Sequence, residues 1–253
     1  MTGFFITGTD TGVGKTRFTS LLASCLRGRG VAVRVCKPVA TGAQWNEDGQ
    51  LISDDTRQLG LAAGDLDFDS LTPYRFETPA NPSLAARLAG SAYTINDLVV
   101  AVRRREQEGA VTLIEGVGGI MCPLTEKETI ADLASSLGYP LLVVARRSLG
   151  TLNHLFLTLE AAQSHGLEVA GVIMSETEPP VDLASRHNPT EFSIRSRAPL
   201  LAILPYEPDP ALGQGKRIVD AIDWPGLPSR GPGLGLLPRP KTPVVSFAQI
   251  QLP

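Results

Sequence analysis

The chain has 253 residues, 43% of them hydrophobic, so it can bury a sizeable core in one large domain or two small ones. Its formal net charge of -3 excludes the basic excess of proteins that bind nucleic acid or anionic membranes, and we expect neither partner. No apolar run approaches the ~20 residues of a membrane-spanning helix. Three widely spaced cysteines indicate free thiols in a reducing compartment, so we expect a cytoplasmic protein.

Short apolar runs rich in β-branched residues alternate with longer amphipathic runs along most of the chain. Continuous hydrophobicity over so few residues is typical of strands buried on both faces, as in parallel sheets. The alternation predicts an α/β fold with a single doubly wound, mainly parallel sheet and helices on both faces. Strands are expected at residues 4–7, 31–39, 111–116, 140–145, 169–174 and 199–205, and helices at 15–29, 95–107, 130–137, 152–165 and 181–195.

The first expected strand leads into the segment GTDTGVGKT, which opens an amphipathic helix. Backbone N–H groups of such a turn and helix start can bind phosphate oxygens. Lys15 would add a positive charge at the outer phosphates, and the Thr16 hydroxyl can ligate Mg²⁺. The strict phosphate-loop pattern requires glycine where Thr9 stands, but the glycine lies one place earlier, at Gly8. The segment therefore predicts a phosphate-binding loop, with a Gly-rich turn that binds nothing as the alternative. The displaced glycine leaves open whether the loop misses the pattern by chance or belongs to a different class of nucleotide loop.

Charged residues follow the next strands, at the sheet edge where sites of doubly wound folds lie. Lys37 follows the second strand, and a solvated lysine is the alternative reading of it. Asp54 and Asp55 stand at a helix start, where carboxylates also act as caps. Glu115 ends the third strand before a glycine-rich turn, a suitable place for a Mg²⁺ carboxylate.

Two further features lie after the fourth strand. A helix beginning at Gly150 or Thr151 could hold a carboxylate at its positive end, or be a plainly capped helix. Arg146 and Arg147 could help to bind an anion or be solvated. From residue 229 the sequence turns Gly/Pro-rich without periodicity. We expect a domain at residues 1–228 that carries the phosphate loop, and an extended or disordered tail at 229–253.

The segments GTDTGVGKT, KPVATG, EGVGG…PL, GTLNH and GVI, in this order between Thr2 and Tyr206, resemble the dethiobiotin synthetase family of biotin synthesis. The family's loop has its glycine where Gly8 stands. The resemblance implies a P-loop NTPase-like ligase that uses ATP and Mg²⁺. Its substrates would be 7,8-diaminopelargonate (7,8-diaminononanoate) and CO₂ or bicarbonate. A carbamate would be phosphorylated to a carbamic-phosphoric anhydride, and the second amine would close the ring of dethiobiotin.

The resemblance also implies roles for individual residues. Lys37, Lys15 and Thr11 would be catalytic, and Thr16, Asp54 and Glu115 would bind Mg²⁺, with Asp54 preferred to Asp55 by its spacing from Lys37. Substrate would be bound by Lys37, Thr41, Gly150, Thr151, Leu152 and Asn153, the last four across a homodimer interface. Nucleotide would be bound by Gly8, Thr9, Asp10, Gly12, Val13, Gly14, Lys15, Thr16, Arg17, Asp54, Glu115, Gly116, Val117, Gly118, Ser175, Glu176 and Pro205.

One departure from the family concerns the base. Ser175 stands where the family commonly has an asparagine that recognises adenine, so other nucleoside triphosphates are expected to serve as well. Two alternative functions remain. A cobyrinate-type amide ligase would carry a glutamine-hydrolysing domain, for which we find no room after Tyr206. A ParA/MinD-like nucleotide-switch ATPase would carry an extra lysine in the loop, where this chain has Thr9 to Thr11.

Overall fold

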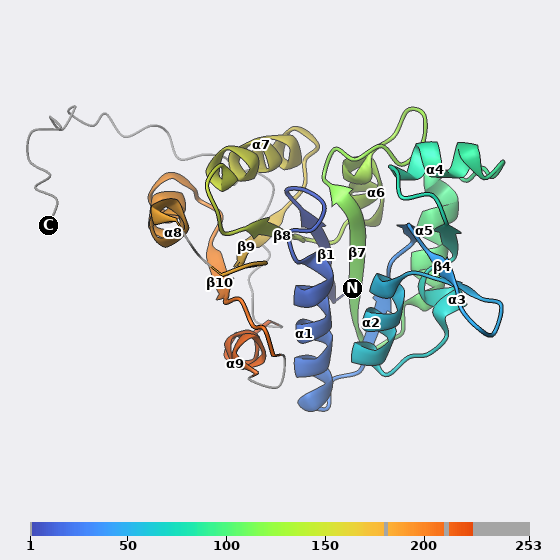
Figure 1. The fold of residues 1–253 in the computed structure, drawn as a ribbon, viewed down its shortest axis with the longest axis horizontal. Coiled ribbons are helices and arrows are strands. Elements are labelled where there is room, and N and C mark those ends of the chain that lie inside the picture. Colours follow the sequence, from blue (N-terminus) through green and yellow to red (C-terminus); the bar gives the residue numbers. More distant parts are fainter. Residues whose placement is uncertain (1, 180–181, 210–212, 225–253) are drawn as a thin grey trace, which may run out of the picture.

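The computed structural model describes residues 2–179, 182–209 and 213–224. In this part of the chain, six parallel strands form one sheet in the order β10-β9-β8-β1-β7-β2 (Figure 1). The expected doubly wound α/β fold is confirmed, and each expected strand has a counterpart in this sheet. The strands are β1 (Gly3–Gly8), β2 (Val33–Cys36), β7 (Val111–Gly119), β8 (Leu141–Arg146), β9 (Val169–Ser175) and β10 (Leu200–Leu204).

The strand expected at residues 31–39 is divided in two. β2 ends at Cys36, and the chain then leaves the sheet through Lys37 and Pro38. Proline has no N–H to continue the ladder. After it, β3 (Val39–Thr41) pairs in parallel with β6 (Tyr74–Phe76) in a separate small sheet. A short antiparallel hairpin of β4 (Gln44–Trp45) and β5 (Leu51–Ile52) follows. The division directs Lys37 away from the strand ladder.

The helices that the sequence predicted are found, with ends that shift by no more than a few residues. They are α1 (Lys15–Gly28), α5 (Ile95–Arg105), α6 (Ile130–Leu137), α7 (Thr151–Ser164) and α8 (Leu183–Arg195). Short helices account for most of what was not predicted, because few turns give little periodicity to recognise. These are α3 (Phe68–Leu71), α4 (Pro82–Leu88) and α9 (Gln214–Asp220). The helix start expected at Asp54 and Asp55 is that of α2 (Asp54–Ala63), whose length was not predicted.

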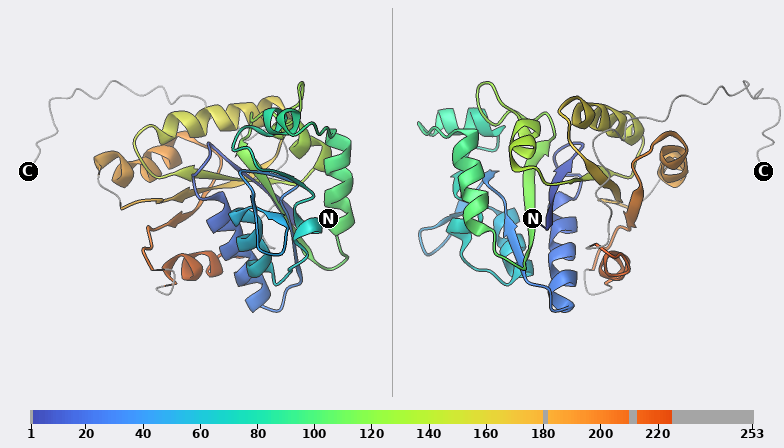
Figure 2. Two further views of the ribbon diagram at one scale, coloured as in Figure 1. Left: turned by 45° about the vertical axis from the view of Figure 1, so that its right-hand side comes forward. Right: turned by 180° about the vertical axis from the view of Figure 1, so that it is seen from behind.

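Helices cover both faces of the sheet (Figure 2). Alternate residues of β1 divide the core, as the period of a strand requires. Phe5 belongs to the core cluster on one face, which also contains Leu98 of α5 and Leu155 of α7. Ile6 packs with Phe18 of α1 on the other. None of the helices in the described ranges is long and apolar enough to cross a membrane. The expected tail at 229–253, and its boundary with the domain, lie outside the described residues.

The position of β1 in the sheet fixes where the site lies. β1 is hydrogen-bonded to β7 on one side and to β8 on the other. The chain passes from β1 through α1 to β2 beyond β7, whereas the later strands β9 and β10 lie beyond β8. The strand order therefore reverses at β1, and ligands of such folds bind at the carboxyl ends of the strands at this point. The loop 9–14 lies there, and Glu115 lies in β7 opposite Ile6, two residues before β1 ends. The strand expected at 111–116 extends to Gly119, so Glu115 does not end it as expected.

Candidate functional site

The loop between β1 and α1 has the geometry of a phosphate cradle. Gly14 has φ +97° and is the N-cap of α1, with no side-chain cap, so the first-turn N–H groups are left for another acceptor. Gly8 explains the displaced glycine of the motif. A Cβ at Gly8 would lie 2.9 Å from Lys15 Nζ and 2.9 Å from the Asp10 carbonyl oxygen, to which that ammonium donates. Only glycine leaves room for Lys15 to fold back along the loop.

Four side chains from separate elements meet beside this loop. The Thr16 hydroxyl lies 2.7 Å from Glu115 Oε1 and 2.9 Å from Asp55 Oδ1. Lys37 Nζ donates to Glu115 Oε1 at 2.9 Å and also to Asp55 Oδ2. Lys37 is 3% exposed and Glu115 0%. Glu115 Oε2 is buried with no hydrogen-bond partner, so this cluster has an unused oxygen. β7, α1, α2 and the turn after β2 thus converge on a paired cation and two carboxylates.

Lys37 and Asp55 stabilise each other's ionised forms. Burial alone would lower the pKa of Lys37, but Glu115 and Asp55 outweigh it and raise that pKa. Burial acts to raise the pKa of Asp55, yet the charge of Lys37 prevails and lowers it. For Lys15, burial lowers the pKa, and the attraction of Glu115 only partly offsets it. Lys37 is therefore a fixed cation and a poor proton acceptor near neutral pH.

A cavity of about 390 Å³ opens above the loop. The residues that line it include Lys15, Thr16, Lys37 and Asp55. Predicted site residues that also line it are Thr11, Gly12, Gly14, Arg17, Thr41, Val117 and Gly118. An adjoining cavity of about 360 Å³ shares Thr11 and Gly118 with it and is also lined by Thr9, Asp10, Met121, Cys122, His154 and Leu157.

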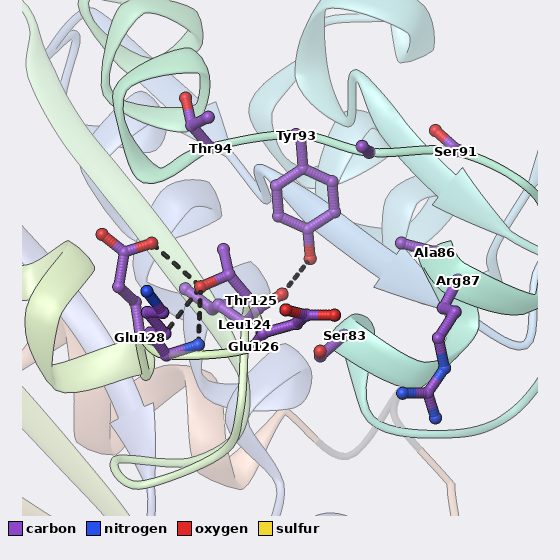
Figure 3. Close-up of a pocket in the computed structure, with 12 residues that line it drawn as sticks. Ser83, Ala86, Arg87, Ser91, Tyr93, Thr94, Leu124, Thr125, Glu126 and Glu128 are labelled. Atoms are coloured by element: carbon purple, nitrogen blue, oxygen red, sulfur yellow. Dashed lines mark hydrogen bonds between the residues drawn. The ribbon is translucent and has the colours of Figure 1, made fainter.

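A third cavity, of about 490 Å³, lies between α4 and the segment 124–128 (Figure 3). The Tyr93 hydroxyl donates to the Leu124 carbonyl within it. None of its lining residues lines the loop cavity, so it is a separate feature.

Comparisons with known proteins settle the family. A family model described as AAA domain matches residues 2–211. The chain is 40% identical over 210 residues to the ATP-dependent dethiobiotin synthetase BioD of Anaeromyxobacter dehalogenans (strain 2CP-C), covering 83% of this chain and 92% of that one. It is 38% identical over 207 residues to the enzyme of that name from Anoxybacillus flavithermus, covering 81% and 92%. The chain belongs to the dethiobiotin synthetase family.

Similarity to solved structures supports the fold of this family member and nothing beyond the fold. A ParA family ATPase from Chlorobium tepidum TLS is similar with a TM-score of 0.51 and 14% identity, over 88% of this chain and 95% of that one. The cell division ATPase MinD of Pyrococcus furiosus has a TM-score of 0.50 and 18% identity, over 87% and 96%. At such identities the likeness gives no support to the switch-ATPase alternative.

The preference for Asp54 over Asp55 is corrected by the geometry. Ser53 is the N-cap of α2, and Asp54 at its first position is exposed to solvent. Successive helix residues point about 100° apart, so only the next side chain, Asp55, turns toward Thr16 and Lys37. The contacts to Thr16 and Lys37 are thus made by Asp55 and not by Asp54, which the dethiobiotin synthetase resemblance favoured.

The two neighbours provide a matched test. Asp55→Asn removes a carboxylate that holds both Thr16 and Lys37, and we expect kcat to fall by about 10²-fold, as when one electrostatic partner of a site is lost. Asp54→Asn makes the same change one residue away, on the solvent side, and should leave kcat within about twofold. Steady-state rates of the two variants measure the difference. Equal losses, or the larger loss from Asp54→Asn, would contradict the placement of Asp55.

The residues expected around the nucleotide base are largely engaged with one another. Ser175 is fully buried, and its Oγ, without a hydrogen-bond partner, lies 2.7 Å from where a Cβ on Gly14 would be. Glu176 pairs with Arg147 at 2.7 Å and accepts from the Tyr206 N–H at 3.0 Å. Glu176 therefore links the ends of β9 and β10, whereas the Ser175 hydroxyl lies against Gly14 with no partner among the described residues.

Arg17, on α1, is also already paired with other groups of the protein. Its Nη2 donates to the Pro205 carbonyl at 2.7 Å and pairs with Glu207 at 2.6 Å. Glu207 in turn accepts from the first N–H groups of α9, at Gln214 and Gly215. Sequence reasoning missed this link, because only the fold brings Arg17 and Glu207 together.

Gly150, Thr151, Leu152 and Asn153 begin α7, as expected, but they do not line the loop cavity of their own chain. Gly150 has φ +89° and no side-chain cap, and the Thr151 Oγ1 is buried without a partner. Val13 and Gly116 are buried parts of the framework; a Cβ on Gly116 would lie 3.2 Å from Phe5. His154, which was not among the predicted site residues, lines the adjoining cavity.

Proposed function

We propose that the chain closes the ureido ring of dethiobiotin from 7,8-diaminopelargonate, CO₂ and ATP. The observation that carries this function is the buried Lys37, fixed between Glu115 and Asp55 at the phosphate loop. A permanently charged lysine at this edge suits a reaction in which one anion, a carbamate, attacks another, the γ-phosphate. Family membership supplies the substrate class.

The oxygen donors beside the loop fit a magnesium ion. Thr16, Asp55 and Glu115 converge within hydrogen-bond distance, and Glu115 Oε2 is a buried oxygen with no partner. Hydroxyl and carboxylate oxygens are the ligands that Mg²⁺ prefers. These three residues would hold the ion, with Asp55 in place of Asp54. When bound, it would neutralise charge on the phosphate oxygens.

The side chains act mainly by position and charge. One substrate amine forms a C–N bond to CO₂ and loses a proton, which gives the carbamate. A carbamate oxygen then attacks the γ-phosphorus, and ADP leaves. The second amine attacks the carbonyl carbon, the C–O bond breaks, and inorganic phosphate departs. Lys37 and Lys15 would stabilise the two adjoining anions, and Thr11, which lines the loop cavity, would orient the transferred group.

A second copy of the chain would complete the substrate site. Three apolar side chains near α7 and the adjoining cavity are exposed: Leu149 by 80%, Leu157 by 61% and Met121 by 51%. A homodimer that covers them would bring the uncapped start of α7 to the partner's loop cavity, where its N–H groups could hold the substrate carboxylate. This arrangement accounts for the distance of Gly150 to Asn153 from the cavity of their own chain.

Nucleotide selectivity should be weak. The Ser175 hydroxyl is buried against Gly14 and is shorter than the amide expected there, and the Pro205 carbonyl already accepts from Arg17. A single hydroxyl does not reproduce the paired donor and acceptor of an amide. Sites that discriminate strongly do so with buried polar groups built to pair with the preferred substrate. We expect kcat/KM for ATP, CTP and GTP to agree within about 10²-fold, measured by phosphate release. Activity with ATP alone would contradict this prediction.

The function itself is tested by the product. The native chain, incubated with Mg·ATP, bicarbonate and 7,8-diaminopelargonate, should yield a compound with the mass of the diamine plus CO₂ minus water. Mass spectrometry of the acidified mixture detects it. Recovery of unchanged diamine under all conditions would contradict the proposal.

A further inference from the structure

β8 ends in two arginines whose surroundings differ. Arg147 pairs with Glu176 at 2.7 Å and donates to the Ser185 carbonyl at 2.5 Å, so it joins α8 to the end of β9. Arg146 has no hydrogen bond or ion pair with any described side chain, and its Nε is buried without a partner. The reaction outlined above makes no use of it. Arg147 therefore has a structural role, and Arg146 has none that the described residues explain.

The backbone places Arg146 beside the phosphate loop. β8 runs parallel to β1 with Val144 opposite Gly8, so both strands end at the same edge of the sheet. A Cβ built on Gly12 would have one atom within 4 Å, Nη2 of Arg146 at 3.9 Å. Gly12 itself is exposed, with φ +71°. The guanidinium of Arg146 thus lies against the loop at Gly12.

The other cations around the loop already have partners. Lys37 is matched by Glu115 and Asp55, and Arg17 by Glu207. Lys15 donates to a backbone carbonyl of the loop itself. Among the described residues at this edge, Arg146 is the guanidinium with no carboxylate. A half-buried, unpaired guanidinium is costly, and an anion bound at the loop would offset that cost.

We propose that Arg146 binds a phosphate oxygen of the nucleotide at the Gly12 side of the loop. The proposal rests on the proposed function only in taking a nucleoside triphosphate as the ligand of the loop. A guanidinium suits this task because its planar donors match phosphate oxygens in pairs. Arg146 would hold the phosphate chain from the β8 side of β1, whereas Lys37, Glu115 and Asp55 lie on the β7 side.

Calorimetric titration of the full chain in Mg²⁺ with ATP, inorganic tripolyphosphate and adenosine tests the assignment. Arg146→Ala should weaken ATP and tripolyphosphate alike, by about 10- to 100-fold, the loss expected for hydrogen bonds to a charged group. Adenosine binding should not change, and Arg146→Lys should recover part of the affinity. Arg87→Ala is the matched control, because it removes the same charge from the separate cavity of Figure 3 and should behave as the native chain does.

Several results would overturn the assignment. Unchanged tripolyphosphate affinity in Arg146→Ala would remove Arg146 from the phosphate site. Equal losses for adenosine and ATP would indicate a structural role. Native ATP affinity with a raised KM for the diamine would assign Arg146 to the substrate carboxylate instead. If Arg146→Ala weakens tripolyphosphate binding while the native chain fixes no CO₂ into product, this inference stands and the proposed function is contradicted. The two failures are therefore distinguishable.

Discussion

Replacement of Lys37 by methionine is expected to lower kcat by about 10²- to 10³-fold, while the Kd for Mg·ATP stays within a few-fold of the native value. Lys37 follows β2, outside the loop that cradles the phosphates, and its ammonium is fixed by Glu115 and Asp55. Methionine keeps most of the stem but removes the charge that would stabilise the carbamate and the transferred phosphoryl group. Single-turnover rates and calorimetric titration separate the two effects, and native turnover would contradict the role of Lys37.

A folding control is needed, because Lys37→Met removes the ammonium that pairs with the buried Glu115 carboxylate. Breaking a buried ion pair on one side costs about 3–5 kcal/mol. The double variant Lys37→Met/Glu115→Gln removes both charges and should regain most of the lost free energy of unfolding. It should remain inactive. If the double variant recovers stability and turnover together, the loss in Lys37→Met was one of folding.

Glu115→Gln is expected to lower the rate by at least about 10²-fold and to raise the Mg²⁺ concentration needed for half-maximal activity. Changing even a residue that only supports a metal ligand lowers metal affinity or activity about 10- to 100-fold. Glu115 is closer than that, because its buried carboxylate contacts Thr16 and Lys37 directly. Glutamine keeps the shape but has no charge with which to bind the ion. A magnesium titration of the initial rate measures both effects.

The control for this change is Glu126→Gln, which removes a carboxylate from the separate cavity. That variant should have the native magnesium titration. An unchanged titration in Glu115→Gln would count against Glu115 as a metal ligand, whatever happened to the rate.

Much of the fold could be predicted because the central strands are buried on both faces. The continuous apolar runs of β8 and β9 are typical of strands buried on both faces of a parallel sheet. The sequence did not reveal that β2 stops at Cys36, since the apolar pattern continues through Val39. Only the pairing of β3 with β6 shows that Pro38 ends one sheet and leads to another.

The site was predictable where a residue's role depends on its place at a strand end. Lys37 directly follows β2, and Lys15 opens the helix after the loop that follows β1, because carboxyl ends of parallel strands meet at one edge. Glu115 was expected at the end of its strand but lies in the middle of β7. Asp54 and Asp55 are not. The hairpin of β4 and β5 lies between Lys37 and α2, so spacing along the chain could not fix the helical phase that selects Asp55. The pairing of Arg17 with Glu207 joins residues far apart in sequence and left no local pattern.

The measurement that tests the account most directly is the fixation of labelled bicarbonate into acid-stable product, with Mg·ATP and 7,8-diaminopelargonate omitted in turn. We predict that label is retained only when every component is present, and that Lys37→Met slows its fixation by about 10²- to 10³-fold. ATP hydrolysis with no label fixed in the complete mixture would contradict the ring-closing function and favour a nucleotide-switch ATPase.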